Sequence, residues 1–227
     1  MTQIIANTKT LGTAEIIAAR EYPEIIANPE INANPEINAT PEINATPEII
    51  ATRQQWSGGF LECVVIDYKN SRGETVQWEA VRRRNCDGIV AVVPFTLDGE
   101  VVLVKQFRPP VGKYVVEFPA GLRDRKETLM ETARRELLEE TGYDAGRLTE
   151  VAAGPLSAGA STELLTVFVA SRAVYAGRQR LDPNEEIEII KLPVEGFLEG
   201  VAALENANTL IDLKLYGLFV LAARRLE

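Results

Sequence analysis

Strand-like patterns dominate the chain between residues 60 and 118. Five segments have the alternating or continuous apolar character of β-strands: 60–68, 75–82, 88–97, 100–107 and 114–118. The N-S-R-G-E sequence at 70–74 and the Asp98-Gly99 pair have turn composition, so we expect two antiparallel hairpins. The segment 88–97 is apolar at nearly every position, which indicates a buried strand.

The segment 128–142 has the period and the end signals of a helix. Thr128 and Glu131 form the capping-box pattern, and Gly142 suits the left-handed position after the last turn. Leu129, Ala133 and Leu137 supply its apolar side. Because the glutamates of this segment fall mainly elsewhere, we expect them on an exposed face of the helix.

Strands and helices continue in mixed order toward the C-terminus. Further strands are predicted at 149–153, 163–171 and 186–192, and a helix at 194–204. A last helix is predicted to open at Thr209-x-x-Asp212, with an apolar stripe made of Ile211, Leu215, Leu218, Phe219 and Ala222. This order predicts the α/β class, with a mixed sheet packed between helices.

A hexapeptide beginning P-E-I occurs five times between residues 23 and 52. Proline at every sixth position removes a backbone donor and limits any helix to about one turn. Two interpretations remain open, a short β-solenoid and an extended or disordered arm. We favour the arm, because five short coils without glycine corners bury little surface. The chain is therefore divided into an arm, 1–52, and a folded domain, 53–227.

Composition limits the classes of function. The formal net charge of −9 argues against a basic face for nucleic acid. No apolar run approaches the roughly 20 residues that span a bilayer. No secretory signal is apparent, and Cys63 and Cys86 lack metal-type spacing, so a cytoplasmic location is expected. The chain has no histidine, which excludes His-ligated zinc and Ser-His or Cys-His catalysis.

Glu136, Glu139 and Glu140 are spaced so that they share one face of the helix. On most helices such a trio is a solvated face paired with arginines, and Arg134 and Arg135 are close enough in sequence for that. The alternative is a bound cation. Without histidine its ligands must be oxygen atoms, which Mg²⁺ and Mn²⁺ prefer.

The spacing around this trio resembles the signature of Nudix hydrolases. Gly121, Glu127 and the R-E-L-x-E-E-x-G sequence at 135–142 match its fixed positions, and Tyr143 departs from its final aliphatic position. The resemblance implies a Nudix-type mixed β-sheet sandwiched between helices, a Glu127–Arg135 pair, and two or more Mg²⁺ or Mn²⁺ ions. The implied metal ligands are Glu136, Glu139, Glu140 and the carbonyl oxygen of Ala120.

The segment 101–122 resembles ADP-ribose and ADP-sugar pyrophosphatases, above all in Q-F-R-P-P and E-F-P-A-G-L. The similarity implies a swapped homodimer, in which 53–85 is a hairpin region for dimerisation and base binding and 86–227 is the catalytic core. It implies that Trp56 and Trp78 stack on adenine. Contacts with the base or ribose are implied for Glu79 and Arg83.

The same resemblance implies roles closer to the reacting phosphates. Arg108 would contact phosphate, for which a guanidinium group is suited. Glu117 would approach the metal site or the terminal ribose. Glu185 aligns best with the general base of these relatives, with Glu186 as its neighbour, although an acidic pair at the start of a strand is more often simply solvated.

Three functions remain open. The first is Mg-dependent hydrolysis of ADP-ribose or a related ADP-sugar to AMP and a sugar phosphate. The second is hydrolysis of another nucleoside diphosphate derivative, such as a GDP-sugar or an oxidised nucleoside diphosphate. The third is a non-catalytic nucleotide-sugar sensor. Ala158 stands where ADP-ribose pyrophosphatases usually have proline, which leaves the choice of substrate open.

Overall fold

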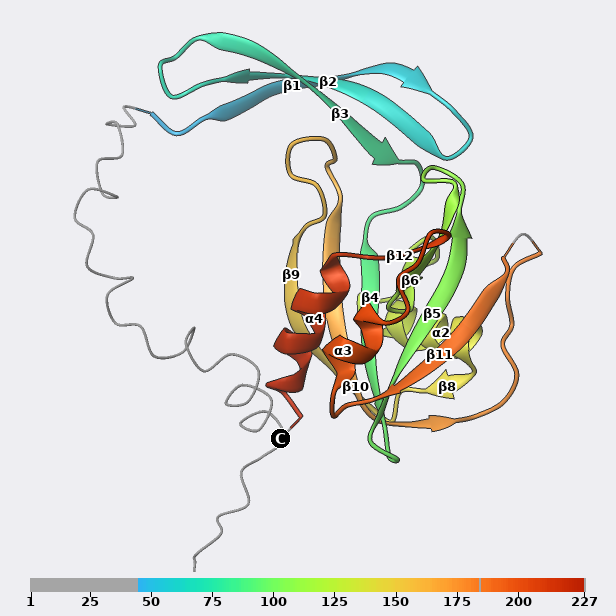
Figure 1. Cartoon of the computed structure of the whole chain (residues 1–227). Helices are drawn as coiled ribbons and strands as arrows, with labels where there is room; N and C mark the ends of the chain where they lie inside the picture. Colours follow the sequence, from blue (N-terminus) through green and yellow to red (C-terminus); the bar gives the residue numbers. More distant parts are fainter. Residues whose placement is uncertain (1–44, 184, 227) are drawn as a thin grey trace, which may run out of the picture.

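Two β-sheets and three helices make up the part of the chain that the computed structural model describes, residues 45–183 and 185–226 (Figure 1). Expectations for residues 1–44, which include most of the proline repeats, lie outside the described residues. Within the described ranges, no helix is both long enough and apolar enough to cross a membrane.

The smaller sheet, here called the N-terminal sheet, is antiparallel with the order β1-β2-β3. Its strands are β1 (Glu48–Ser57), β2 (Leu61–Lys69) and β3 (Thr75–Arg83). The predicted hairpin at 60–82 is confirmed as β2 and β3. Strand β1 was not predicted. It follows the last repeat proline, Pro47, so its ten residues are free of the backbone restriction that proline imposes, and pairing starts before residue 53.

The larger sheet has nine strands, of which six follow the order β12-β6-β5-β4-β10-β8. In addition, β11 pairs with β5, β7 with β4, and β9 with β10. The strands are β4 (Ile89–Thr96), β5 (Glu100–Arg108), β6 (Lys113–Glu117), β7 (Ala120–Leu122), β8 (Tyr143–Asp144), β9 (Arg147–Pro155), β10 (Leu164–Tyr175), β11 (Ile187–Pro193) and β12 (Thr209–Ile211). Because β10 runs parallel to β4 and β12 parallel to β6, the predicted mixed sheet is confirmed.

Helices cover both faces of the larger sheet, as predicted. Helix α2 (Leu129–Thr141) packs through Ala133 and Leu137 against alternate residues of β4, Val90 and Val92. Helices α3 (Phe197–Ala202) and α4 (Lys214–Ala223) cover the opposite face, where the other β4 residues, such as Val93, join a core with Phe197 and Phe219. This double packing explains why the sequence is apolar at nearly every position of 88–97.

The prediction for the last helix is wrong at its start. Thr209 is not a helix cap, because Thr209–Ile211 form β12, which pairs with Tyr114, Val115 and Val116 of β6. Thr209 and Ile211 are both buried. Pairing at the edge of the sheet satisfies the backbone of these residues and buries their side chains, so it outweighs the local capping pattern. Helix α4 begins only at Lys214.

The N-terminal sheet lies across one end of the larger sheet, next to the loop between β9 and β10 (Figure 1). Strand β3 contacts this loop through its backbone. Val81 N donates to Ala160 O at 2.8 Å, and Thr162 N donates to Val81 O at 3.1 Å. The indole N–H of Trp78 donates to Gly159 O at 2.9 Å. These bonds join the two sheets within one chain.

Candidate active site

The ends of α2 are set by the capping signals found in the sequence. Glu131 N donates to the hydroxyl of Thr128 at 3.2 Å, and Thr128 N donates to the Glu131 carboxylate at 2.7 Å. Gly142 has a φ of 73°, and its N–H donates to Leu138 O at 2.9 Å. Because both ends are fixed, the direction of each glutamate along the helix is fixed too.

Glu140 is buried, with 6% of its surface exposed, so the expectation of an exposed face is wrong for this residue. It follows Ala133 by seven positions and Leu137 by three, which places it on the packed stripe of the helix. Its carboxylate accepts a hydrogen bond from Ala120 N at 3.0 Å. Glu136 and Glu139 are less deeply covered, with side chains 14% and 30% exposed.

Burial changes the titration of the two innermost carboxyls. Burial raises the pKa of Glu140 well above its usual range, and the negative charges of Glu136, Glu185 and Glu117 raise it further. Burial also raises the pKa of Glu136, although Arg135 partly offsets this effect. Both raised pKa values mean that too little positive charge lies near Glu136 and Glu140 to stabilise their ionised forms. A bound cation would supply that charge.

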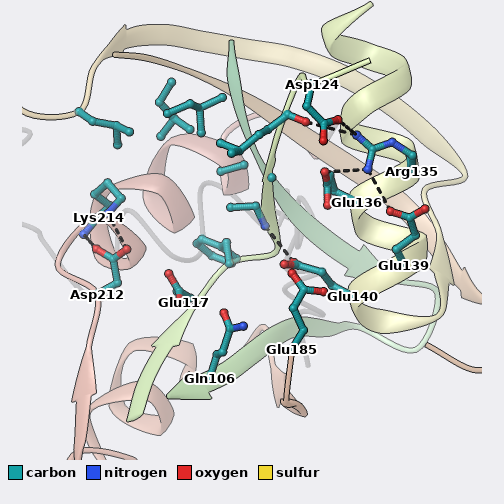
Figure 2. A pocket seen from close by; sticks show the side chains of 18 of the residues that line it. Gln106, Glu117, Asp124, Arg135, Glu136, Glu139, Glu140, Glu185, Asp212 and Lys214 are labelled. Atoms are coloured by element: carbon teal, nitrogen blue, oxygen red, sulfur yellow. Dashed lines mark hydrogen bonds and ion pairs between the residues drawn. The ribbon is translucent and has the colours of Figure 1, made fainter. Parts of the chain in front are cut away.

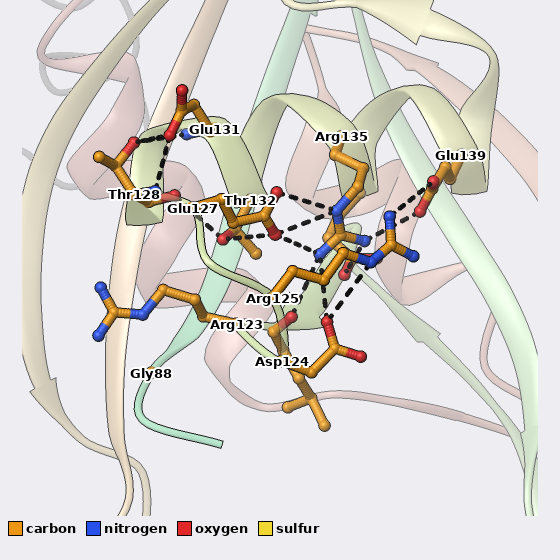
Figure 3. A network of polar contacts seen from close by, with 12 residues as sticks. Gly88, Arg123, Asp124, Arg125, Glu127, Thr128, Glu131, Thr132, Arg135 and Glu139 are labelled. Atoms are coloured by element: carbon orange, nitrogen blue, oxygen red, sulfur yellow. Dashed lines mark hydrogen bonds and ion pairs between the residues drawn. The ribbon is translucent and has the colours of Figure 1, made fainter. Parts of the chain in front are cut away.

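Arg135 holds the loop before α2 against the helix (Figure 3). Its guanidinium donates to Glu127 at 2.6 Å, which is the pair that the resemblance implied. The same side chain donates to Glu136 at 2.8 Å and to Glu139 at 2.9 Å. It therefore connects the loop to two of the three glutamates of the trio.

Gly121 packs closely against the side chain of Glu136. A Cβ atom added to Gly121 would lie 2.0 Å from the carboxyl carbon of Glu136. Strand β7 pairs with β4, opposite Val90 and Ala91, and this pairing keeps residues 120 and 121 beside the helix. The backbone at Ala120 and the Glu136 carboxylate are therefore held side by side.

These groups line a cavity of about 440 Å³ between α2 and the start of α4 (Figure 2). Eight of the residues proposed from the sequence line it: Arg83, Arg108, Glu117, Ala120, Glu136, Glu139, Glu140 and Glu185. Arg108 Nε donates to Glu117 at 2.6 Å. Glu185 points toward Glu140 in Figure 2, whereas its neighbour Glu186 is exposed and lies outside the cavity lining.

Comparison with known proteins places this geometry in a family. The family model for the NUDIX domain matches residues 87–212, which is more than half of the chain. The chain belongs to the Nudix family. The matched range, here called the Nudix segment, contains the whole of α2 and almost all of the cavity lining.

Relatives and a solved structure agree with this membership. An ADP-ribose pyrophosphatase from Bacillus subtilis is 36% identical over 67% of this chain and 81% of its own length. An ADP-sugar pyrophosphatase from Mus musculus is 37% identical over 70% of this chain and 79% of its own length. The crystal structure of an ADP compounds hydrolase has the same fold, with a TM-score of 0.64, 22% identity, and coverage of 80% of this chain and 95% of that one.

Three of the proposed substrate contacts lie away from the cavity, on the N-terminal sheet ahead of the Nudix segment. Trp56 and Trp78 are 56% and 49% exposed, and Glu79 is also exposed. Trp56 lies opposite Cys63, whereas Trp78 lies opposite Ile66, so the two indoles leave opposite faces of the sheet. Their assigned role requires a second copy of the chain and stays a prediction.

Sequence reasoning missed several residues that line the cavity. Asp212 and Lys214 form an ion pair of 2.6 Å at its end near α4, and β12 brings them there. In the sequence, Asp212 matches a helix-capping pattern, which gives no local signal for the cavity. Gln106 and Arg180 are further members of the lining. Ala158 lies in the β9–β10 loop outside the lining, while Leu156 of the same loop belongs to it.

The carboxylates of the Nudix segment offer oxygen donors for a hard divalent cation. In this structure they are not arranged around a common point as metal ligands would be. Within residues 45–183 and 185–226, no three Asp, Glu or Cys side chains are grouped as a metal site. Glu136 and Glu139 turn toward Arg135 instead. The donor set nonetheless fits such an ion, because it consists of oxygen atoms and includes a buried carboxylate short of positive charge.

Proposed function

We propose that this Nudix protein hydrolyses the diphosphate bond of ADP-ribose or a related ADP-sugar, giving AMP and a sugar phosphate. The observation that carries the proposal is one cavity lined by buried Glu140, partly buried Glu136 and the cation Arg108. An acidic wall can hold cations, and the arginine can hold phosphate. The names of the Bacillus subtilis and mouse relatives support the ADP-sugar class.

Nudix hydrolases generally use divalent metal ions, and we assign Mg²⁺ or Mn²⁺, with two or more ions, to this site. The ligands would be the carboxylates of Glu136, Glu139 and Glu140 and the carbonyl oxygen of Ala120. When bound, the ions would polarise the diphosphate and lower the pKa of a water molecule. Turning Glu136 and Glu139 from Arg135 toward the cavity requires only side-chain rotation.

The remaining groups of the cavity bind the substrate and move the proton. Arg108 would bind the diphosphate, and Glu117, which accepts its hydrogen bond, would hold the guanidinium in place or contact the terminal ribose. Glu185 would accept the proton of the attacking water, because it lines the cavity beside Glu140. Glu186 is a poorer candidate, since it is exposed outside the lining.

We further propose that two copies of the chain complete the base site. Exposed apolar side chains on the N-terminal sheet include Trp56 at 56% and Trp78 at 49%, and Phe60 in the loop between β1 and β2 is 87% exposed. A homodimer through residues 53–85 would cover them and offer Trp56 and Trp78 for stacking on adenine. Glu79 and Arg83 would contact the base or ribose, while residues 86–227 form the catalytic core. A cytoplasmic location suits such a nucleotide-sugar hydrolase.

A product-resolved assay tests the proposal. Purified full chain with Mg²⁺ is incubated with ADP-ribose, another ADP-sugar, a GDP-sugar and an oxidised nucleoside diphosphate, and products are separated by chromatography. We expect AMP and ribose 5-phosphate from ADP-ribose, and no turnover by Glu140→Gln. Cleavage of the other diphosphates with ADP-ribose left intact would refute the substrate class. Absence of any cleavage, with a melting temperature raised by ADP-ribose, would indicate a sensor.

A further inference from the structure

The side chain of Gln179 bridges two elements of the active site. Its amide nitrogen Nε2 donates to Glu140 O at 2.6 Å and to Ile187 O at 3.1 Å. Glu140 belongs to α2, and Ile187 begins β11, two positions after Glu185. The two N–H bonds of one partly buried amide group therefore join α2 to the start of β11, directly after the segment that carries Glu185.

The surrounding backbone shows why this contact matters for the end of the helix. The last carbonyl groups of a helix lack partners within it. Here Glu139 O accepts from Arg180 N at 2.8 Å, and Gly142 O accepts from Ala176 N at 2.8 Å. Between these two positions, Gln179 Nε2 donates to Glu140 O. The segment 176–180 thus binds to the carboxyl end of α2 by three hydrogen bonds.

Two hydrogen bonds hold Glu185 within its own loop. The segment 176–180 holds this loop beside Glu140. Glu185 N donates to Asp182 O at 2.9 Å, and the Glu185 carboxylate accepts from Asp182 N at 3.0 Å. The downstream side of the loop is held where Ile187 pairs with Gln106 of β5. The upstream side of the loop is anchored to the end of α2 by the hydrogen bonds of Gln179 and Arg180.

We infer that Gln179 is a positioning residue that holds the loop of Glu185 against the carboxyl end of α2, and thereby sets the general base in reach of the water beside Glu140. The inference rests on the proposed role of Glu185. It predicts that loss of the amide lowers kcat, because a small displacement of a catalytic group costs much of the rate. It should leave KM nearly unchanged, because Gln179 lies outside the cavity lining.

Two substitutions remove the bridge without a large change of volume. Gln179→Met keeps the length of the side chain and removes both donors, and Gln179→Glu directs a carboxylate at two carbonyl oxygens. We expect kcat to fall about tenfold in the first and further in the second, with KM within about twofold. Asn206→Leu is the matched control, because Asn206 Nδ2 also donates to a backbone carbonyl, Leu204 O at 3.2 Å, but lies outside the cavity lining, and it should retain wild-type kcat.

A double-mutant cycle with Glu185→Gln separates positioning from general damage. If Gln179 acts through Glu185, Gln179→Met should cost little further activity once Glu185 has been replaced. Equal cost in both backgrounds, or a melting temperature that falls in step with kcat, would overturn the inference. Unchanged kcat in both Gln179 variants would overturn it as well.

Amide hydrogen exchange of the metal-free protein gives a readout that is independent of turnover. In Gln179→Met, amides of 180–183 and 185–187 should exchange faster than in the wild type, while β4 amides should be unaffected. Unchanged exchange in the loop would refute the bridge itself. Full activity of Glu185→Gln would instead refute the proposed general base, and the exchange rates would still decide whether Gln179 holds the loop.

Discussion

Glu140 shows how a single residue can serve function at the expense of folding. It occupies a packed position of α2, where an apolar side chain would normally stabilise the protein. The one hydrogen bond to its carboxylate among the described residues comes from Ala120 N, and the charges of three other carboxylates raise its pKa. An ionised group in such surroundings is costly unless a cation is bound.

Replacement of Glu140 by glutamine should separate activity from stability. Because the folded pKa of Glu140 is raised, the ionised form destabilises the metal-free fold at pH values above its ordinary value of 4.5. Glutamine removes this charge and can still accept from Ala120 N. We expect turnover with Mg²⁺ to fall at least about a hundredfold, and the melting temperature in EDTA at neutral pH to stay equal or rise. A clearly lower melting temperature in EDTA would contradict this account.

Gly121→Ala tests the close approach of β7 to Glu136. The added Cβ would displace the Glu136 carboxylate, which is the end of a flexible side chain, so the fold should lose no more than about 1 kcal/mol. Activity should fall about tenfold or more, because a metal-binding carboxylate moves. Gly154→Ala is the matched control, since the described residues place no atom within 4 Å of its added Cβ. Equal activities of the two variants would refute the role of Gly121.

At the scale of elements, the loop before α2 and the helix itself behave as one unit. Thr128 caps the helix, and Arg135 ties Glu127 and the Leu122 carbonyl to it. Strand β7 then fastens the other end of the loop to β4. The loop is therefore tied at both ends, to β4 and to α2, between the backbone at Ala120 and the glutamate trio. This arrangement fits a site that must hold its charges close together.

Glu127→Gln should weaken this unit in a manner that depends on pH. The hydrogen bond from Arg135 is the main cause that lowers the folded pKa of Glu127 below its ordinary value of 4.5. Ionised Glu127 thus stabilises the fold above pH 4.5, and the contribution is lost as the pH falls through the folded pKa. We expect a loss of about 1 kcal/mol at neutral pH that disappears in acid, measured by urea unfolding at several pH values.

Glu188→Gln is the control for that series. Glu188 pairs with Lys105 at 2.9 Å, but its side chain is 63% exposed, and pairs of this kind contribute little to stability. Its replacement should leave the unfolding free energy nearly unchanged at neutral pH. A loss for Glu127→Gln that stays constant down to low pH would show that shape, and not charge, matters at residue 127.

At the scale of the whole molecule, the cavity is assembled from parts that lie far apart in the chain. Arg83 comes from the N-terminal sheet, Glu140 from α2, Glu185 from the loop before β11, and Lys214 from the start of α4. The contacts of β3 with the β9–β10 loop join the N-terminal sheet to this assembly. Only the complete fold therefore presents one site.

Removal of residues 1–44 should leave the enzyme active, because within the described residues the first strand begins at Glu48 and the first lining residue of the cavity is Arg83. We expect kcat and KM of the truncated chain 45–227 to lie within about twofold of the full chain. Removal of residues 1–57 would delete β1 and the predicted stacking residue Trp56, so it should raise KM. An inactive 45–227 chain would show that the repeats take part in the site.

Local signals in the sequence were enough to identify α2 and its charges. The capping residues at both ends and the helical period act over a few turns and were confirmed, as was the Glu127–Arg135 pair, whereas the expected exposure of Glu140 was wrong. Strand pairs joined by short turns were equally readable, because both partners lie within one hairpin. The roles assigned to individual residues by resemblance remain predictions.

Only the tertiary structure decided the features that depend on distant partners. Thr209–Ile211 became a strand because β6, almost a hundred residues earlier, accepts it at the edge of the sheet. That pairing, continued by the hydrogen bond from Asp212 N to Val116 O at 3.0 Å, brings Asp212 and Lys214 to the cavity. Likewise, Gln179 can form its two hydrogen bonds only because the fold brings the end of α2 and the start of β11 together beside it. Short-range periodicity and capping determine which segments fold as helix or strand, whereas long-range pairing and burial determine which side chains share a site.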